Sequence, residues 1–215
     1  MTQITNDHVE WAVVSRLRRM LEEPPHQKFN VTQAYALFTT ILCWVLQHTR
    51  IPSHEIKSDN DKIAHRLWEN FSDRAIADDP WCVYVKPIER IELVGNKSIR
   101  VPPPRNFEEH TVDRFLINLR DATAHGDARK VQPFNFPISS EQLLVGFHFA
   151  CAEYKDSKHR SRKTWEGEIT LLEGDFRRIG VQLAKIYCDA LRHDERHRRD
   201  GNFGADAASV KEAAA

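Results

Sequence analysis

The chain has 215 residues and a mass of 25.0 kDa, the size of one ordinary domain. Hydrophobic residues make up 41% and charged residues 29%, so the chain can bury a core and is not a disordered polymer. Lys plus Arg and Asp plus Glu each number 31, which gives a formal net charge of zero. This balance excludes polybasic nucleic-acid binding by the chain as a whole, and any such contact must come from a local patch.

No segment has the character of a membrane span or a signal peptide. The longest apolar run, 34–46, is too short to cross a bilayer, and residues 1–7 are polar. We therefore predict a cytoplasmic protein without membrane contact. The cysteines are scattered without a CxxC pair, and reduced, buried thiols are expected rather than disulfides or a zinc site. They are Cys43, Cys82, Cys151 and Cys188.

The first third of the chain has helical periodicity. Apolar residues at helical spacing predict helices over 5–23, 30–50 and 58–71, with Asn30 as the cap of the second. The second helix is apolar on nearly every side, which predicts that it is the central core helix.

The middle of the chain changes character. Residues 78–105 contain five prolines and a predicted small hairpin over 91–101, turning at 95–96. We interpret this Pro-rich segment as an excursion between two helical halves. Helical periodicity returns over 106–125, and Gly126 is placed to end that helix.

The last third combines strands with a helix. Apolar alternation over 143–154 and 164–172 predicts a hairpin with a long loop. A final helix is predicted over 175–193, and 200–215 is expected to be a frayed tail.

Several common chemistries have no motif here. The sequence has no P-loop, no GxGxxG before a helix, no GxSxG and no HExxH. His193 and His197 have a chelating spacing, but they lie in a wholly polar stretch without a visible third ligand. We therefore predict neither a metal site nor a cofactor.

Arg120 and His125, in the segment LRDATAHG, form the informative pair. Three Arg-x4-His pairs occur where about one is expected by chance, but only this one ends an amphipathic helix. On an ideal helix the two side chains point about 140° apart with a rise of about 7.5 Å, so a bend or a second protomer would help them meet. Imidazole transfers protons near neutral pH and guanidinium forks onto phosphate, a combination that suits a phosphodiester.

The segment resembles the signature of the HEPN superfamily, in which Arg, a polar residue, three to five further residues and His follow an amphipathic helix. The matching positions are Arg120, Asp121 and His125. The resemblance implies a mainly α fold: a HEPN-like bundle of four to five helices, with a β-hairpin inserted between the motif helix and the last helix. On this view 1–199 is a single domain containing the Pro-rich excursion 76–105 and the hairpin 143–172.

The resemblance also implies an activity. Many HEPN proteins are metal-independent endoribonucleases that dimerise through their motif helices, often as toxins or in phage defence, with an antitoxin or regulatory partner. The RNA 2′-hydroxyl would attack its own 3′-phosphate and leave a 2′,3′-cyclic phosphate. His125 would transfer the proton, Arg120 would stabilise the charge, and Asp121 would orient one of them. Members controlled by adenylylation have Tyr two residues after the His, where this chain has Asp127.

Two other interpretations stay open. The domain could be a non-catalytic HEPN module that binds nucleotide or RNA or serves in dimerisation. Alternatively, the chain could be a helical interaction protein in which Arg120 pairs with Asp113, Asp121 or Asp127.

The predicted hairpin loop carries a basic stretch that is either a phosphate-binding rail or simply a solvated loop. Its residues are Lys155, Lys158, Arg160, Arg162 and Lys163.

Overall fold

The computed structural model describes residues 9–23, 30–94, 96–124, 129–138, 141–155 and 162–191. Within them the helices are α1 (Val9–Glu22), α2 (Asn30–Thr49), the short 3-10 helix η2 (Ser53–Glu55), α3 (Asp59–Phe71), α4 (Val112–Ala124) and α5 (Glu173–Leu191). The strands are β1 (Arg90–Val94), β2 (Lys97–Val101), β3 (Val131–Ile138), β4 (Glu141–Tyr154) and β5 (Lys163–Leu172).

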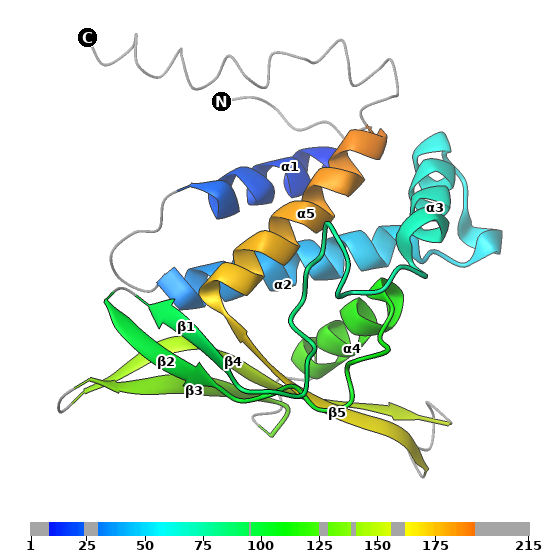
Figure 1. The fold of residues 1–215 in the computed structure, drawn as a ribbon. Helices are drawn as coiled ribbons and strands as arrows, with labels where there is room; N and C mark the ends of the chain where they lie inside the picture. Colours follow the sequence, from blue (N-terminus) through cyan, green and yellow to red (C-terminus); the bar gives the residue numbers. More distant parts are fainter. Residues whose placement is uncertain are drawn as a thin grey trace, which may run out of the picture.

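The helices gather on one side of a sheet, and α2 lies at their centre. Helices α1, α3 and α5 pack against α2, and α4 lies between α2 and the sheet (Figure 1). The prediction that α2 is the core helix is confirmed, because its inner side is buried from Ala34 to Thr49. Helix α5 approaches α1 closely at Gly180, where a Cβ atom would come within 2.6 Å of the Leu21 side chain.

Strands β3, β4 and β5 form an antiparallel sheet with β4 in the middle. The pairing of β4 with β5 confirms the predicted hairpin, and Phe149 lies opposite Ile169 in its register. Both residues are buried against the helices, so alternate residues of these strands face the core. The other residues face outward and form what we call the outer face of the sheet.

The expectation of a mainly α, HEPN-like helical bundle with an inserted hairpin is wrong. The described chain is mixed α/β, with one two-stranded and one three-stranded antiparallel sheet. The larger sheet is a wall of the core rather than an insertion. Strand β3 escaped the sequence analysis because Pro133 and Pro137 interrupt its pattern, yet an edge strand tolerates proline.

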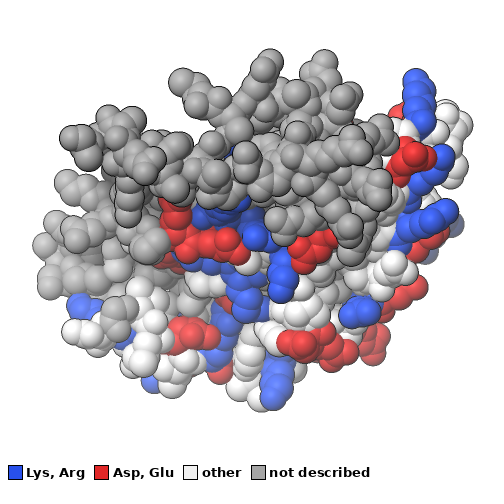
Figure 2. Space-filling view, turned by 90° about the horizontal axis from the view of Figure 1, so that it is seen from above, with Lys and Arg blue, Asp and Glu red and all other residues white. Residues whose placement is uncertain are grey.

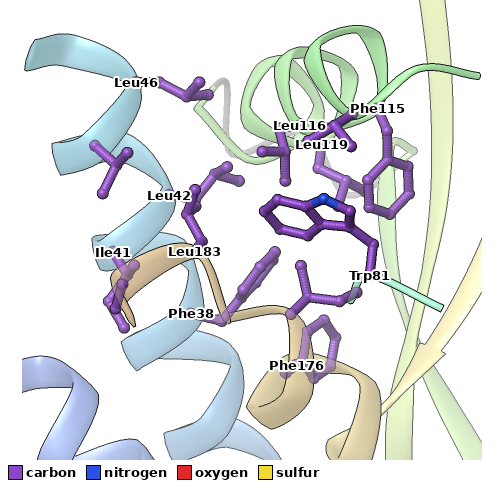
Figure 3. Packing of buried hydrophobic residues seen from close by; sticks show 14 of the residues in the cluster. Phe38, Ile41, Leu42, Leu46, Trp81, Phe115, Leu116, Leu119, Phe176 and Leu183 are labelled. Atoms are coloured by element: carbon purple, nitrogen blue, oxygen red, sulfur yellow. The ribbon is translucent and has the colours of Figure 1, made fainter. Parts of the chain in front are cut away.

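The Pro-rich segment contributes to the core. The predicted hairpin is confirmed as β1 and β2, although Gly95 at its turn lies outside the described residues. Trp81 is fully buried between Phe115, Leu116 and Leu119 of α4 and the side chains of α2 and α5 (Figure 3). The segment therefore takes part in the core through its buried side chains, Trp81 above all.

Two of the four cysteines are buried and two are exposed. Cys151 and Cys188 are buried, whereas Cys43 and Cys82 are exposed, and all four are free thiols. The expectation of a buried Cys43 is wrong because this residue lies on the outward side of α2. On the face shown in Figure 2, acidic and basic side chains are intermixed. None of the helices in the described ranges combines the length and apolarity that a membrane span requires.

Candidate functional site

Helix α4 carries the first two residues of the motif in its last turns. One side of this helix is buried in the core through Val112, Phe115, Leu116, Leu119 and Ala122. The helix begins at Val112 rather than at residue 106, because the preceding residues form a turn with Phe107 buried. Thr111 caps its start, where the Arg114 amide donates to Thr111 Oγ1 at 3.4 Å.

Arg120 and Asp121 lie together at the surface. Arg120 Nε is 2.7 Å from Asp121 Oδ1, and the two side chains are 35% and 50% exposed. Despite this closeness, the Nε–H group is buried and has no hydrogen-bond acceptor among the residues that the structure describes. The contact is therefore mainly a charge attraction, and one donor of the guanidinium remains to be satisfied.

The rest of the motif lies beyond the described residues. His125 and Asp127 belong to the segment 125–128, which the structure does not describe. The pairing of Arg120 with His125 therefore stays a prediction. Of the alternative carboxylates, Asp121 is near Arg120, and Asp113 has a buried oxygen without a hydrogen-bond partner among the described residues. Burial raises the pKa of Asp113.

A broad cavity of about 980 Å³ adjoins the end of α4. Its wall on α4 is formed by Thr123 and Ala124, and α2 supplies most of the remainder, including Cys43 and Trp44. Burial raises the pKa of the Cys43 thiol, and the nearby positive charge of Arg120 opposes this effect. The guanidinium of Arg120 therefore acts on the part of α2 that lines this cavity.

His48 lies in the wall of the same cavity and links three helices. Its Nδ1 is 2.5 Å from the Tyr187 hydroxyl on α5, and its Nε2 is 3.0 Å from Asp61 Oδ1 on α3. Burial alone would raise the pKa of Asp61, but hydrogen bonds from the Ser58 and Lys57 amides and from His48 lower it to about 2. Every group of this trio is satisfied, so the trio holds helices together rather than offering a nucleophile.

A second polar network joins α4 to β4. Arg114 donates to both carboxylate oxygens of Glu153, at 2.6 and 3.0 Å, and Asn118 donates to the same carboxylate at 2.9 Å. The Arg114 guanidinium also lies 5.1 Å from the centre of the Trp165 ring. Neighbouring His110 is buried, and its burial and the charge of Arg114 lower its pKa to about 4 despite the opposing Glu153. Sequence reasoning missed this network because its central partners, Arg114 and Glu153, are 39 positions apart.

The basic stretch of the hairpin loop is described only in part. Lys155, Arg162 and Lys163 are exposed, whereas Lys158 and Arg160 lie outside the described residues. The Lys155 amide donates to the Arg162 carbonyl at 3.0 Å, and Lys163 Nζ is 2.6 Å from Glu166. One of the cations is therefore partly neutralised, and the structure does not bring these residues to Arg120.

No family model, curated protein or solved structure matches the chain. The likeness to the HEPN superfamily therefore rests on the motif alone. In the portion of the chain that the structure describes, no three His, Cys, Asp or Glu side chains are grouped to hold a metal ion.

Proposed function

We propose that this protein is a metal-independent endoribonuclease that uses Arg120, Asp121 and His125. The observation that carries the proposal is the state of Arg120, because its side chain is 35% exposed and its one ion-pair partner among the described residues is Asp121, its neighbour in the chain. A guanidinium of this kind suits a phosphodiester, because its N–H groups can bind the two non-bridging oxygens that share one negative charge. The motif supplies an imidazole five residues later, and the two groups together match the needs of phosphodiester cleavage.

The proposed reaction is an internal transesterification. The 2′-hydroxyl oxygen attacks the adjacent 3′-phosphorus, and the P–O5′ bond breaks. His125 accepts the 2′ proton, and the departing 5′ oxygen takes a proton from water, so the products are a 2′,3′-cyclic phosphate and a 5′-hydroxyl. Arg120 stabilises the negative charge that develops on the phosphorane. Asp121 orients the Arg120 side chain through the close contact already described.

A homodimer through the motif helices belongs to this proposal. Two copies of the end of α4 would bring two Arg120 side chains to one RNA strand, which offsets the angular separation of Arg and His on a single helix. The partner that would restrain such an enzyme, an antitoxin or another regulator, is proposed on the resemblance only.

The decisive experiment measures RNA cleavage in EDTA. A labelled single-stranded RNA is incubated with the wild type, Arg120→Ala, His125→Ala and the control Arg66→Ala, which removes an exposed arginine on α3. We expect the first two substitutions to lower the cleavage rate by about 10²-fold or more, and the control to cut like the wild type. The same RNA with 2′-O-methyl groups should stay intact. A wild type that never cuts, or an Arg120→Ala variant that cuts normally, would refute the proposal.

The non-catalytic alternative is favoured by one observation. Asp121 already offsets part of the charge of Arg120, as it would in a module that only binds. In that case the wild type would bind the methylated RNA without cutting the unmodified one.

A further inference from the structure

The outer face of the sheet carries a row of side chains that spans four segments of the chain. Arg105 pairs with Glu168 as an isolated antiparallel bridge, and Glu168 pairs with Ala150 between β5 and β4. The Ala150 amide donates to the Lys130 carbonyl at 2.8 Å, just before β3 begins. Directly opposite residues share a face of a sheet, so these four side chains lie side by side.

This row explains a hollow of about 500 Å³ on the outer face, which we call the sheet hollow. Two small residues of β4 form part of its floor, and longer side chains stand around them. The floor residues are Ala150 and Ala152, and the rim includes Arg105, Arg129, Lys130, Tyr154 and Lys163.

The Arg105 side of the rim is fixed by a close approach of backbones. Two hydrogen bonds of 2.8 and 3.2 Å join Arg105 to Glu168. Gly167 permits this approach, because a Cβ atom there would lie 2.8 Å from the Arg105 carbonyl oxygen and 2.4 Å from the Trp165 ring. Asn106, at φ 61°, donates from its side chain to the Glu166 carbonyl at 2.8 Å. The rim is therefore held in position before any ligand arrives.

The charge of the hollow favours an anion. Four cationic side chains line it against two carboxylates, Glu166 and Glu168. Arg105 is 3.2 Å from Glu168, and both side chains are well exposed, so this pair contributes little to stability and can admit a phosphate. Lys130 is half-buried and has no ion-pair partner among the described residues. Tyr154 adds an aromatic ring on which an unpaired base can stack.

The sheet hollow borders a second cavity that reaches α4. This second cavity, of about 560 Å³, is lined by Asp121 of the motif, and the two cavities share Lys130, Ala152 and Tyr154. A strand leaving the motif would therefore pass Lys130 to enter the sheet hollow. We propose that the sheet hollow binds the sugar-phosphate backbone of single-stranded RNA next to the cleavage site. This inference rests on the proposed endoribonuclease function.

The test measures binding and cleavage separately. Fluorescence anisotropy follows a labelled single-stranded RNA that carries 2′-O-methyl groups throughout and so cannot be cut. We expect Lys130→Glu to raise its Kd about tenfold, and we expect the double variant Lys130→Glu/Lys163→Glu to reduce the slope of log K against log salt by about 1.4. The matched control Lys97→Glu makes the same charge change at an exposed site on β2 and should bind like the wild type.

A substitution without charge change tests the hollow itself. Ala152→Leu fills the floor, and we expect it to weaken binding about as much as Lys130→Glu while circular dichroism shows a folded chain. If Lys130→Glu binds as tightly as Lys97→Glu, or if Ala152→Leu binds like the wild type, the proposal is wrong. The endoribonuclease function and RNA binding in the sheet hollow can fail separately. Binding of RNA in the hollow without any cleavage would overturn only the endoribonuclease function. Cleavage that depends on Arg120, with RNA binding unaffected by the hollow variants, overturns only the hollow.

Discussion

Two arginines on α4, six positions apart, each pair with a carboxylate, and the two pairs have very different consequences. Arg114 donates two hydrogen bonds to Glu153, which belongs to β4, so this pair fastens the helix to the sheet. Arg120 contacts Asp121, its own neighbour in the chain, so this pair does not connect α4 to another element. The comparison teaches that the partner's place in the fold, more than exposure, separates a structural arginine from one that is available for a ligand.

The largest expected effect is a loss of folding stability at acidic pH, caused by protonation of His110 in the network of Arg114. Buried His110 has a pKa of about 4, below its ordinary value of 6.5, so the unfolded chain binds the proton first. Stability is then fully present above pH 6.5 and falls as the pH drops toward 4, by about 3 kcal/mol. Urea unfolding between pH 7.5 and 4.5 measures this loss.

The control for the acid experiment is His110→Phe. It removes the titrating group while keeping an aromatic ring beside Phe107 and Trp165, which lie 4.6 and 4.5 Å from the His110 ring by their centres. The variant should lose most of the pH slope between 6.5 and 4.5. An unchanged slope would mean that His110 does not carry this acid sensitivity. Glu153, whose pKa is lowered by hydrogen bonds from Arg114 and Asn118 that outweigh its burial, adds its own loss at lower pH.

Two isosteric substitutions sharpen the contrast directly. Glu153→Gln turns a carboxylate oxygen into an amide that faces the Arg114 and Asn118 donors, and we expect a loss of about 2 kcal/mol. Asp121→Asn removes the same charge from the exposed pair and should change the free energy of unfolding by less than about 0.5 kcal/mol. Both values come from urea denaturation at pH 7.5. Equal losses would erase the distinction between the two arginines.

A smaller effect is expected when each arginine is replaced by lysine. An ammonium group cannot bridge both oxygens of Glu153 or stack on Trp165, so Arg114→Lys should cost about 1 kcal/mol. Arg120→Lys should leave the thermal midpoint almost unchanged and should slow RNA cleavage if the proposed function is right. A variant of Arg120 that unfolds earlier than the Arg114 variant would contradict the comparison.

Much of the secondary structure could be predicted because its signals are local. The periodicity of α2 and the alternation of β4 and β5 depend only on residues that are close in the sequence. The structure confirms these three elements. Strand β3 was missed because Pro133 and Pro137 are breakers in most strands, and only the pairing with β4 shows that this one lies at an edge. The fold class was wrong because the predicted hairpin was taken for an insertion in a helical bundle, whereas the three-stranded sheet closes the core.

The candidate site shows the same limit more strongly. The motif residue Arg120 is visible in the sequence because its neighbours form a short signature. Glu153 and Arg105 carry no such signal, because the first meets Arg114 across a helix–sheet contact and the second reaches β5 from a loop. A single sequence contains no information about which distant residues share a register, so the network and the sheet hollow required coordinates.

The smallest expected effect is a change in the reactivity of Cys43 on α2, which tests whether the charge of Arg120 acts on this thiol. Its positive charge opposes the rise that burial causes in the pKa of Cys43, so Arg120→Ala should raise that pKa further. Fewer thiolates at a fixed pH mean a slower reaction with a disulfide reagent, by about twofold.

The background for this measurement is Cys82→Ser, because Cys82 is the other exposed thiol. Cys151 should react slowly, since burial, the main cause, raises its pKa to about 12. Arg66→Ala serves again as the matched control on α3 and should leave the Cys43 rate unchanged. If Arg120→Ala also leaves it unchanged, the guanidinium does not act on the cavity beside α2.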